Sequence, residues 1–598
     1  MTSPDPTSRS ADRVAALRAL LAQDGLQGFV VPRADAHQGE YVPPHAERLA
    51  WLTGFTGSAG LAIVLGRKAA IFVDGRYTLQ VGDQIDPAVF EVRHITDEPA
   101  AAWLRESLSG GGRLGYDPWL HTAEGAARLR AACEAVGAEL APVAENPIDR
   151  LWEDRPSRPD APFESHPPEL AGETSADKRA ALAEKLAERG VEAAMLTLPD
   201  SIAWLLNIRG RDVPRTPFPL SFAILRNDAT VALFAPAGKI DAALADHLGG
   251  DIALEPPDAF EGALGGFAGR KVLADPASAA DRIFRVLDAA GALVERGADP
   301  CQLPKACKNA VELEGARNAH RRDGAALTRF LAWLAREAPG GAVDEIAAAD
   351  RLEGFRRESN LLRDLSFDTI SGAGPNGAIV HYRVTPETNR RLAPGALYLV
   401  DSGGQYADGT TDVTRTVAIG TPTAAMRRHF TLVLKGHIAL ATARFPQGTT
   451  GSQIDALARM ALWGDGLDYD HGTGHGVGSY LSVHEGPQRI SKLPNSIALK
   501  PGMIVSNEPG YYRTGEYGIR IENLVAVQEV EVPGAERSML GFETLTLAPI
   551  DRALIDRALL TADETGWVDG YHARVRETIG PLVDPETAAW LEEATRPL

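Results

Sequence analysis

The sequence has little of three features that mark secreted, membrane-embedded or nucleic-acid-binding proteins. Only three of its 598 residues are cysteines, Cys133, Cys301 and Cys307. They form no C-x-x-C pair and build no disulfide framework, which favours a reducing compartment. The sequence contains no run of about 18 apolar residues, the length that a membrane-spanning helix requires. A basic excess is also missing, since the formal net charge is -19, which argues against general binding to nucleic acids or anionic membranes.

The N-terminal segment is also poor in apolar residues. Residues 1–13 are polar and contain no hydrophobic core of the kind that a signal peptide needs. Together with the scarcity of cysteine, this predicts a cytoplasmic protein.

What the sequence does contain first is a repeated pattern. A chain of 598 residues is too long for one hydrophobic core, so two to four domains are expected. The first copy of the pattern is a helix at 14–21 followed by strands at 28–31, 61–65 and 69–73. The second copy is a helix at 178–188 followed by strands at 193–198, 222–225 and 230–234. The pattern predicts a duplicated α/β domain, with the segment 153–175, rich in proline, serine and acidic residues, as a linker.

The last part of the chain carries five potential metal ligands, each in a short context of its own. They are Asp401, Asp412, His475, Glu508 and Glu522. Four carboxylates and an imidazole cannot be buried together without opposite charge. A pair of divalent cations would neutralise them, and oxygen-rich ligation with one nitrogen suits Mn²⁺, Co²⁺ or Zn²⁺. Any one of these residues alone is typical of an ordinary turn, strand end or loop, so the ordered set carries the prediction.

The spacing of these residues predicts that two hairpins bring them together. Residues 397–401 form an apolar run that ends in an acid, and residues 410–419 alternate in polarity, as paired strands do. Residues 503–508 and 517–525 predict a second hairpin. Paired strands lie only about 5 Å apart. His475 is surrounded by glycines, which let a backbone approach a ligand closely.

Helical patterns flank this stretch. Residues 309–335 predict a long amphipathic helix that opens the last domain. Residues 556–575 and 586–594 predict closing helices, the first of them divided into two pieces by Gly566 and Gly570.

Taken together, these motifs resemble the pita-bread metallopeptidases, and most closely the three-domain cytosolic Xaa-Pro aminopeptidases. The matching stretches are Thr369-Ile-Ser-Gly, Gly377-Ala-Ile-Val-His381-Tyr, Asp408-Gly-Thr-Thr-Asp-Val-Thr-Arg-Thr416, His471-Gly-Thr-Gly-His-Gly-Val-Gly478, Val483-His-Glu-Gly-Pro487 and, near the N-terminus, Asp74-Gly-Arg-Tyr77. The resemblance is dense over 308–549, clear in the first 150 residues and thin between them.

The resemblance implies an α/β (α+β) fold with two related N-terminal α/β domains followed by a C-terminal pita-bread metallopeptidase domain. The expected divisions are 1–155 for an N-terminal creatinase-like domain, 156–305 for a second creatinase-like domain and 306–598 for the catalytic domain. The implied activity is release of the first residue from peptides with proline at the second position. A homodimer is also implied, and no nucleic-acid or membrane partner is expected.

The resemblance also assigns roles within the site. Two divalent ions per chain are implied, with Mn²⁺ preferred over Co²⁺ or Zn²⁺ and a metal-bridging hydroxide as the attacking group. Asp401 would bind one ion, Asp412 and Glu522 would bridge, and His475 and Glu508 would complete the other. Glu508 would also carry a proton to the leaving nitrogen, which is a poor leaving group unless it is protonated.

Three histidines and two arginines complete the implied set. His381 and His484 match residues that hydrogen-bond the substrate and the developing oxyanion, and His471 matches a residue of the proline-side pocket. Arg520 would orient carboxylates beside the substrate, and Arg76, in the first domain, would reach the active site.

Two alternatives remain open from sequence. A prolidase-like enzyme would cleave Xaa-Pro dipeptides only, although prolidase-like chains usually have a single N-terminal domain. A non-catalytic peptide-binding relative would keep the fold without the ligands, whereas this chain has all five.

Overall fold

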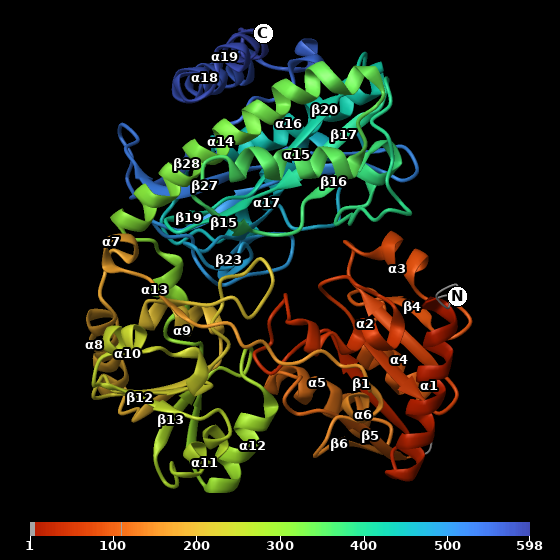
Figure 1. Cartoon of the computed structure of the whole chain (residues 1–598), viewed down its shortest axis with the longest axis vertical. Helices are drawn as coiled ribbons and strands as arrows, with labels where there is room; N and C mark the ends of the chain where they lie inside the picture. Colours follow the sequence, from red (N-terminus) through yellow and green to blue (C-terminus); the bar gives the residue numbers. More distant parts are fainter. Residues whose placement is uncertain (1–5, 109–110) are drawn as a thin grey trace. The chain divides into compact units, whose positions relative to one another are not determined.

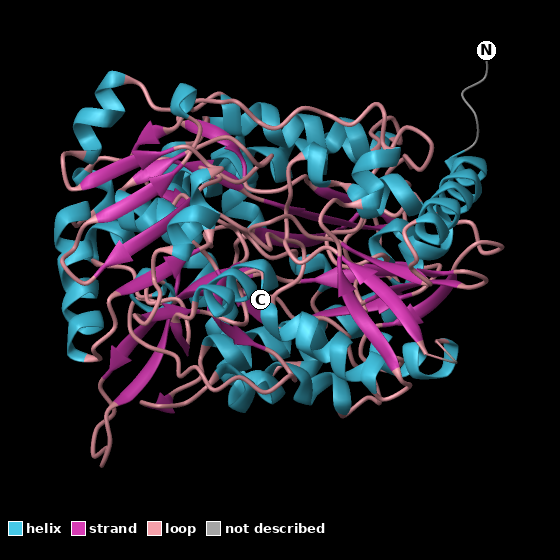
Figure 2. Cartoon of the chain, turned by 90° about the horizontal axis from the view of Figure 1, so that it is seen from below, coloured by secondary structure: helices cyan, strands magenta, loops and turns pink. Residues whose placement is uncertain are grey.

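The computed structural model describes residues 6–108 and 111–598, and the chain folds as two compact units. The first unit contains residues 1–167 and 173–302, and the second contains residues 168–172 and 303–598. Figure 1 colours the chain along its sequence, and Figure 2 shows the helices in cyan and the strands in magenta. Among the described residues, no helix has the length and the apolar character that crossing a membrane requires.

The first unit begins with a six-stranded sheet in the order β4-β3-β2-β1-β5-β6. Its strands are β1 (Gly28–Pro32), β2 (Leu61–Leu65), β3 (Ala69–Val73), β4 (Glu91–His94), β5 (Gly112–Tyr116) and β6 (Ala138–Pro142). Helices α1 (Pro6–Gln23), α4 (Ala100–Ser107) and α5 (Ala123–Glu134) belong to the same half. Apolar side chains of α1, such as Leu17 and Leu21, are buried in the same core as those of β1, because burying one apolar helix face is what stabilises such a layer.

The second half of this unit repeats the same sheet. Its order is β12-β11-β10-β8-β13-β14, and each pairing has the same direction as its counterpart in the first half. The elements are α8 (Ser175–Glu188), β8 (Ala193–Leu196), β10 (Phe222–Arg226), β11 (Val231–Phe234), β12 (Ile252–Glu255), β13 (Lys271–Ala274), α12 (Asp281–Ala290) and β14 (Leu293–Arg296). The predicted duplication is therefore confirmed.

The second unit contains two main sheets. The smaller is ordered β16-β17-β20 and the larger β21-β28-β27-β24-β22-β23. Their strands are β16 (Ile370–Ala373), β17 (Leu397–Ser402), β20 (Val413–Ala418), β21 (Phe445–Pro446), β22 (Gly474–Gly476), β23 (Glu485–Ile490), β24 (Ile504–Asn507), β27 (Asn523–Val530) and β28 (Met539–Thr544). Three short strands, β15 (Leu362–Leu365), β18 (Gly404–Tyr406) and β19 (Gly409–Thr410), form another sheet, and β25 (Gly510–Arg513) pairs with β26 (Tyr517–Arg520).

Six helices accompany these sheets. They are α14 (Ala310–Glu337), α15 (Glu345–Arg357), α16 (Ala424–Ala441), α17 (Gly451–Trp463), α18 (Ala562–Ile579) and α19 (Pro585–Ala594). The long helix predicted at 309–335 is confirmed as α14, which begins with a capping box at Asn309. The side chain of Asn309 accepts from the backbone of Glu312, and Glu312 accepts from the backbone of Asn309, so that two otherwise unpaired N–H groups are satisfied.

Two glycines allow the close approaches on which the site depends. A Cβ added to Gly518 in β26 would lie 1.7 Å from the carbonyl oxygen of Gly377, and one added to Gly474 in β22 would lie 2.0 Å from the carbonyl oxygen of Ser506. Both obstacles are backbone atoms, which no rotamer change can move. Only glycine therefore lets β26 and β22 pack at these distances.

Three details differ from the sequence predictions. The strand predicted at 517–525 is divided into β26, which pairs with β25, and β27, which pairs with β24. The single strand predicted at 410–419 is divided into β19 and β20, because Thr411 leaves the strand and its hydroxyl accepts a hydrogen bond from the backbone of Gly404 at 2.9 Å. The predicted break at Gly566 and Gly570 is wrong. Helix α18 is continuous, because a capping box at Thr561 fixes its start and its apolar face, including Val568, Val575 and Ile579, is buried.

Candidate metal centre

Two neighbouring strands bring the first pair of carboxylates together. Asp401 lies near the end of β17, and Asp412 immediately precedes β20. The two strands are antiparallel, with Asp401 opposite Thr414, so the first predicted hairpin is confirmed. Both carboxylates are buried, with Asp401 7% and Asp412 4% exposed.

A second strand pair presents two more carboxylates at one end. Glu508 follows β24 and Glu522 precedes β27, and the antiparallel register places Asn507 opposite Asn523. Both glutamates therefore lie at the same end of this strand pair. The pair is not the simple hairpin that was predicted, because β25 and β26 lie between its strands in the sequence. His475 is in β22, which pairs with β24 in the same sheet.

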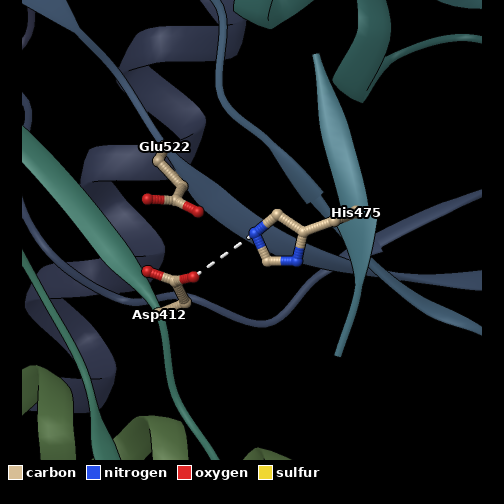
Figure 3. A group of neighbouring side chains, drawn as sticks. All are labelled: Asp412, His475 and Glu522. Carbon is tan, nitrogen blue, oxygen red and sulfur yellow. Dashed lines mark ion pairs between the residues drawn. The ribbon is translucent and has the colours of Figure 1, made fainter. Parts of the chain in front are cut away.

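These side chains converge on a common space. The Nε2 atom of His475 lies 3.5 Å from Asp412 Oδ2 and 3.6 Å from Glu508 Oε1. One ligand atom from each of Asp412, His475 and Glu522 lies within 4.8 Å of the others. Figure 3 shows the imidazole pointing at the two carboxylates from the opposite side.

Within the part of the chain that the structure describes, three carboxylate oxygens at this point have no hydrogen-bond partner. They are Asp401 Oδ1, Asp412 Oδ1 and Glu522 Oε1, all buried and without a hydrogen bond. A buried, unpaired carboxylate oxygen is expensive, and native proteins rarely leave one unless an ion or water completes it. Four carboxylates with one imidazole also form the donor set that a hard or borderline divalent ion requires. The residues present therefore fit a metal centre.

Neighbouring groups fix the orientation of the same ligands. The Nδ1–H of His475 donates to the carbonyl of Gly476 at 2.9 Å, which leaves Nε2 with a lone pair facing the carboxylates. Thr414 donates from its hydroxyl to Glu522 Oε2 at 2.7 Å. Arg520 donates to Asp401 Oδ2 at 2.6 Å, and Ser506 donates to a carboxylate oxygen of Glu508 at 3.1 Å.

Electrostatics at the centre also favour a cation. Burial, followed by the negative charges of Asp401 and Glu508, raises the pKa of Asp412 well above its usual value. Burial, followed by the charges of Asp412, Asp401 and Glu508, does the same to the pKa of Glu522. The protein alone therefore holds these carboxylates at a cost that bound positive charge would remove.

The structure places three predicted histidines around this centre. The ring centroids of His475 and His484 lie 4.3 Å apart, and those of His484 and His381 lie 6.5 Å apart. His471 is bound differently, because its Nε2 accepts a hydrogen bond from the Tyr512 hydroxyl at 2.8 Å while its Nδ1–H donates to the carbonyl of Gly472.

The two predicted arginines lie in different units. Arg520 belongs to the second unit and touches Asp401 directly. Arg76 belongs to the first unit, where it pairs with Glu40 at 3.0 Å and with Asp74 at 2.8 Å. Its role in the site stays a prediction.

Sequence reasoning missed three residues that support the ligands. Tyr512 accepts from Arg520 at 2.6 Å and so joins His471 to the Asp401 side of the site. Thr414 and Ser506 support Glu522 and Glu508 through the hydrogen bonds described above. Only Thr414 had a signal in the sequence, since it alternates with Asp412 on one strand face.

Models of known protein families match four consecutive parts of the chain. Residues 314–529 match metallopeptidase family M24, and residues 538–598 match the C-terminal region of that family. Residues 13–151 and 154–312 each match a creatinase/prolidase N-terminal domain.

Similar proteins span nearly the whole chain. A "Probable Xaa-Pro aminopeptidase P" of Talaromyces marneffei is 41% identical over 617 aligned residues, which cover 99% of this chain and 93% of that protein. "Aminopeptidase P2" of Arabidopsis thaliana is 40% identical, with 98% of this chain and 88% of that protein covered. The crystal structure of X-prolyl aminopeptidase from Caenorhabditis elegans, described as a cytosolic enzyme with a di-nuclear active site, superposes with a TM-score of 0.94. It is 35% identical and covers 98% of this chain and 100% of its own.

Proposed function

This chain belongs to metallopeptidase family M24, and from this premise we infer that it is an Xaa-Pro aminopeptidase. Such an enzyme removes the first residue of a peptide whose second residue is proline. The observation that carries the inference is the group of five ligands around three partnerless carboxylate oxygens, set in a chain that is similar to aminopeptidases over nearly its full length. The predicted fold class, two related α/β domains followed by a pita-bread metallopeptidase domain, is confirmed by the same similarity.

We propose that Asp401, Asp412, His475, Glu508 and Glu522 hold two divalent ions, with Mn²⁺ as the preferred metal. When bound, the pair would supply Lewis acidity and lower the pKa of a water molecule. The oxygens of Asp401, Asp412 and Glu522 that have no hydrogen-bond partner among the described residues would be ligand atoms for these ions. The di-nuclear site described for the nematode enzyme supports the stoichiometry.

The proton chemistry falls to Glu508. One of its oxygens is held by Ser506 at 3.1 Å and lies 3.6 Å from His475 Nε2, at the edge of the centre. A carboxylate so placed can take a proton from the attacking water and pass it to the leaving nitrogen. The nitrogen needs that proton because an amide anion is a very poor leaving group.

The histidines around the centre would recognise the scissile bond. His484, whose ring is 4.3 Å from that of His475, and His381 beside it can donate to the substrate carbonyl as charge develops on its oxygen. His471, held by Tyr512, would line the proline side. The nitrogen of an Xaa-Pro bond carries no hydrogen, so this side must select proline by shape rather than by an N–H bond.

From the same family relationship we also propose the domain boundaries, the oligomeric state, the location of the protein and a role for Arg76. The domain boundaries would be 1–155, 156–305 and 306–598, and the chain would act as a homodimer in the cytoplasm. Arg76 would reach the active site from the first domain. A sedimentation experiment at micromolar concentration tests the dimer, and the variant Arg76→Ala, with metal content measured, tests the arginine.

The decisive test of the activity is a small peptide panel. After metal loading, we expect release of the first residue from Xaa-Pro-Yaa peptides, slower cleavage of the Xaa-Pro dipeptide, and a kcat/KM for Xaa-Ala-Yaa lower by about 10²-fold or more. Mass spectrometry identifies the products. A preference for the dipeptide would instead assign a prolidase-like activity, and equal rates on proline and alanine peptides would contradict the proposed specificity.

A further inference from the structure

Helix α17 presents a buried ion pair to the segment that leads into His475. Arg459 is 0% and Asp455 is 3% exposed, and they lie one helical turn apart on the same face. The guanidinium donates from Nε to Asp455 Oδ2 at 2.7 Å. Ion pairs between residues four apart on a helix usually lie at the surface, whereas this one is buried. Burying the two charges is costly unless the other N–H groups of the guanidinium also have acceptors.

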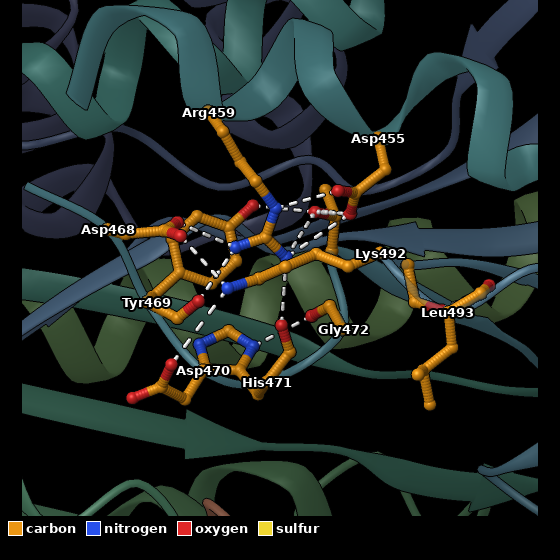
Figure 4. A network of polar contacts seen from close by, with 11 residues as sticks. Asp455, Arg459, Asp468, Tyr469, Asp470, His471, Gly472, Lys492 and Leu493 are labelled. Carbon is orange, nitrogen blue, oxygen red and sulfur yellow. Dashed lines mark hydrogen bonds and ion pairs between the residues drawn. The ribbon is translucent and has the colours of Figure 1, made fainter. Parts of the chain in front are cut away.

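A second guanidinium nitrogen donates to Asp455 Oδ1 at 3.2 Å, and the remaining bonds are made to segment 468–473. One terminal nitrogen donates to the carbonyl of Tyr469 at 2.7 Å and to a carboxylate oxygen of Asp468 at 2.9 Å, and the other donates to the carbonyl of His471 at 3.0 Å. The guanidinium carbon also lies 3.8 Å from the centroid of the Tyr469 ring. Figure 4 shows Arg459 enclosed by these groups, with His471 on the same segment.

Asp455 holds the far end of the same segment through Thr473. The Thr473 hydroxyl donates to Asp455 Oδ1 at 2.6 Å and accepts from the Tyr469 hydroxyl at 2.6 Å. The carbonyl of Thr473 accepts from the backbone N–H of Glu508 at 2.9 Å. The ion pair is thus connected through Thr473 to Glu508, a proposed ligand, and Thr473 is separated from His475 by one residue only.

The segment needs this support because its own sequence does not fix it. Residues 468–473 form no helix or strand, and Gly472 widens the range of backbone conformations available to this segment. Three bonds in one plane, to a carboxylate and two carbonyls, match the rigid fork of arginine. A lysine ammonium keeps the charge but cannot reproduce that geometry.

We propose, on the basis of the proposed function, that Arg459 is a positioning residue for substrate selection. Its fork fixes the backbone at Tyr469 and His471, so that the His471 ring, held at its other end by Tyr512, forms a rigid wall on the proline side. Among the described residues, the side chain of Arg459 hydrogen-bonds to none of the five proposed metal ligands. It therefore acts on the choice between proline and alanine at the second position, not on the chemical step.

The variant Arg459→Lys tests the proposal. We expect the ratio of kcat/KM for Xaa-Pro-Yaa to kcat/KM for Xaa-Ala-Yaa to fall at least about ten-fold, because small misplacements of binding groups cost this much or more, while metal content is retained. A loss of folded protein lowers both values equally and leaves the ratio unchanged, so the ratio separates positioning from stability.

Arg428→Lys is the matched control. Arg428, on the neighbouring helix α16, makes a similar two-bond pair with Asp465 but is 48% exposed and does not reach segment 468–473. Its substitution should leave the ratio at the wild-type value. If Arg459→Lys does not fold, Thr473→Val, which removes the hydroxyl bonded to Asp455, should lower the ratio, and Thr473→Ser should restore it.

The outcomes separate the two proposals. A wild-type ratio near one contradicts the proposed function and this inference together. A clear wild-type preference that Arg459→Lys retains, or that Thr473→Val retains where the lysine variant does not fold, contradicts this inference alone.

Discussion

At the scale of single residues, the metal centre is defined by oxygens that the protein itself leaves without partners. One oxygen of Asp401 accepts from Arg520, one oxygen of Glu522 accepts from Thr414, and one oxygen of Asp412 lies 3.5 Å from His475 Nε2. The other oxygen of each carboxylate is buried and has no hydrogen bond among the described residues. Leaving one buried acceptor unsatisfied costs roughly 1–3 kcal/mol, and more for a charged group. Bound divalent ions would offset that cost, so the site is built for them rather than for the apoprotein.

A first residue-scale prediction concerns His484. If it stabilises the oxyanion, His484→Ala should lower kcat by about 10²-fold or more, comparable to the loss of one oxyanion donor. Metal content, measured by elemental analysis, should stay at the wild-type value. His94→Ala, a change at a partly exposed histidine in the first unit, should alter neither quantity. Wild-type kcat in His484→Ala would make His484 a packing residue, and loss of metal would make it a ligand support.

A second residue-scale prediction concerns pH. Burial raises the pKa of Asp299 to about 6, whereas an unfolded aspartate titrates near 4. Between these values the folded chain binds a proton that the unfolded chain has released, so this group makes stability fall as pH rises from about 4 to 6. The full difference is about 3 kcal/mol.

The variant Asp299→Asn isolates this effect, because an amide keeps an oxygen that can accept from the backbone N–H of Cys301. Its midpoint of thermal unfolding should exceed that of the wild type at pH 7, and the two midpoints should converge near pH 4. A difference that is constant across this range would show that burial does not shift the titration of Asp299.

The sequence predicted the ligand residues better than it predicted their supports. The five ligands stand in a fixed order, each in a short context of its own, and the ordered set could be recognised in the sequence. Tyr512 and Arg459 act through contacts between different elements, such as the bonds that each makes to His471. No local pattern records a bond of that kind, so these residues became visible only in the fold.

At the scale of elements, the pairing of strands could be predicted from alternating polarity and turn residues. Whether a strand is interrupted, or a helix continues through a glycine, depends on tertiary contacts. Both strand pairings that carry the carboxylates were predicted from the sequence and are present as β17–β20 and β24–β27, although the strand predicted at 517–525 is divided between β26 and β27. The break at Thr411 and the continuity of α18 through Gly566 were not predicted. The first depends on a bond to Gly404 and the second on burial of an apolar face, and both outweigh local propensity.

The glycine at the crossing of β26 gives an element-scale prediction. Gly518→Ala places a Cβ 1.7 Å from the carbonyl of Gly377, and we expect a loss of stability of about 3 kcal/mol or more because backbone must move. Activity should fall with it, since Arg520 ends the same strand. The measurement is chemical denaturation with activity assayed on the folded fraction.

Gly566→Ala is the matched control for that substitution. Gly566 lies inside α18 with nothing within 4 Å of its added Cβ, so alanine should stabilise the helix by up to about 1 kcal/mol. Equal effects of the two substitutions would contradict the proposed role of the close approach between Gly518 and Gly377.

At the scale of the whole molecule, the chain combines a duplicated α/β unit with a metal-binding unit. The duplication could be predicted because both copies keep the same order of helix and strands, and both sheets have the same topology. Relatives that cover 98–99% of this chain align with both units.

Metal titration of the apoprotein tests the central claim most directly. Elemental analysis after loading with Mn²⁺ and desalting should give about two ions per chain, with hydrolysis of an Xaa-Pro-Yaa peptide rising as the ions bind. Asp412→Ala should remain folded by circular dichroism, lose bound metal and lose activity, because Asp412 faces both His475 and the partnerless oxygen of Glu522. Full activity of the wild type in excess chelator, or fewer than about one ion per chain in the loaded protein, would contradict the account.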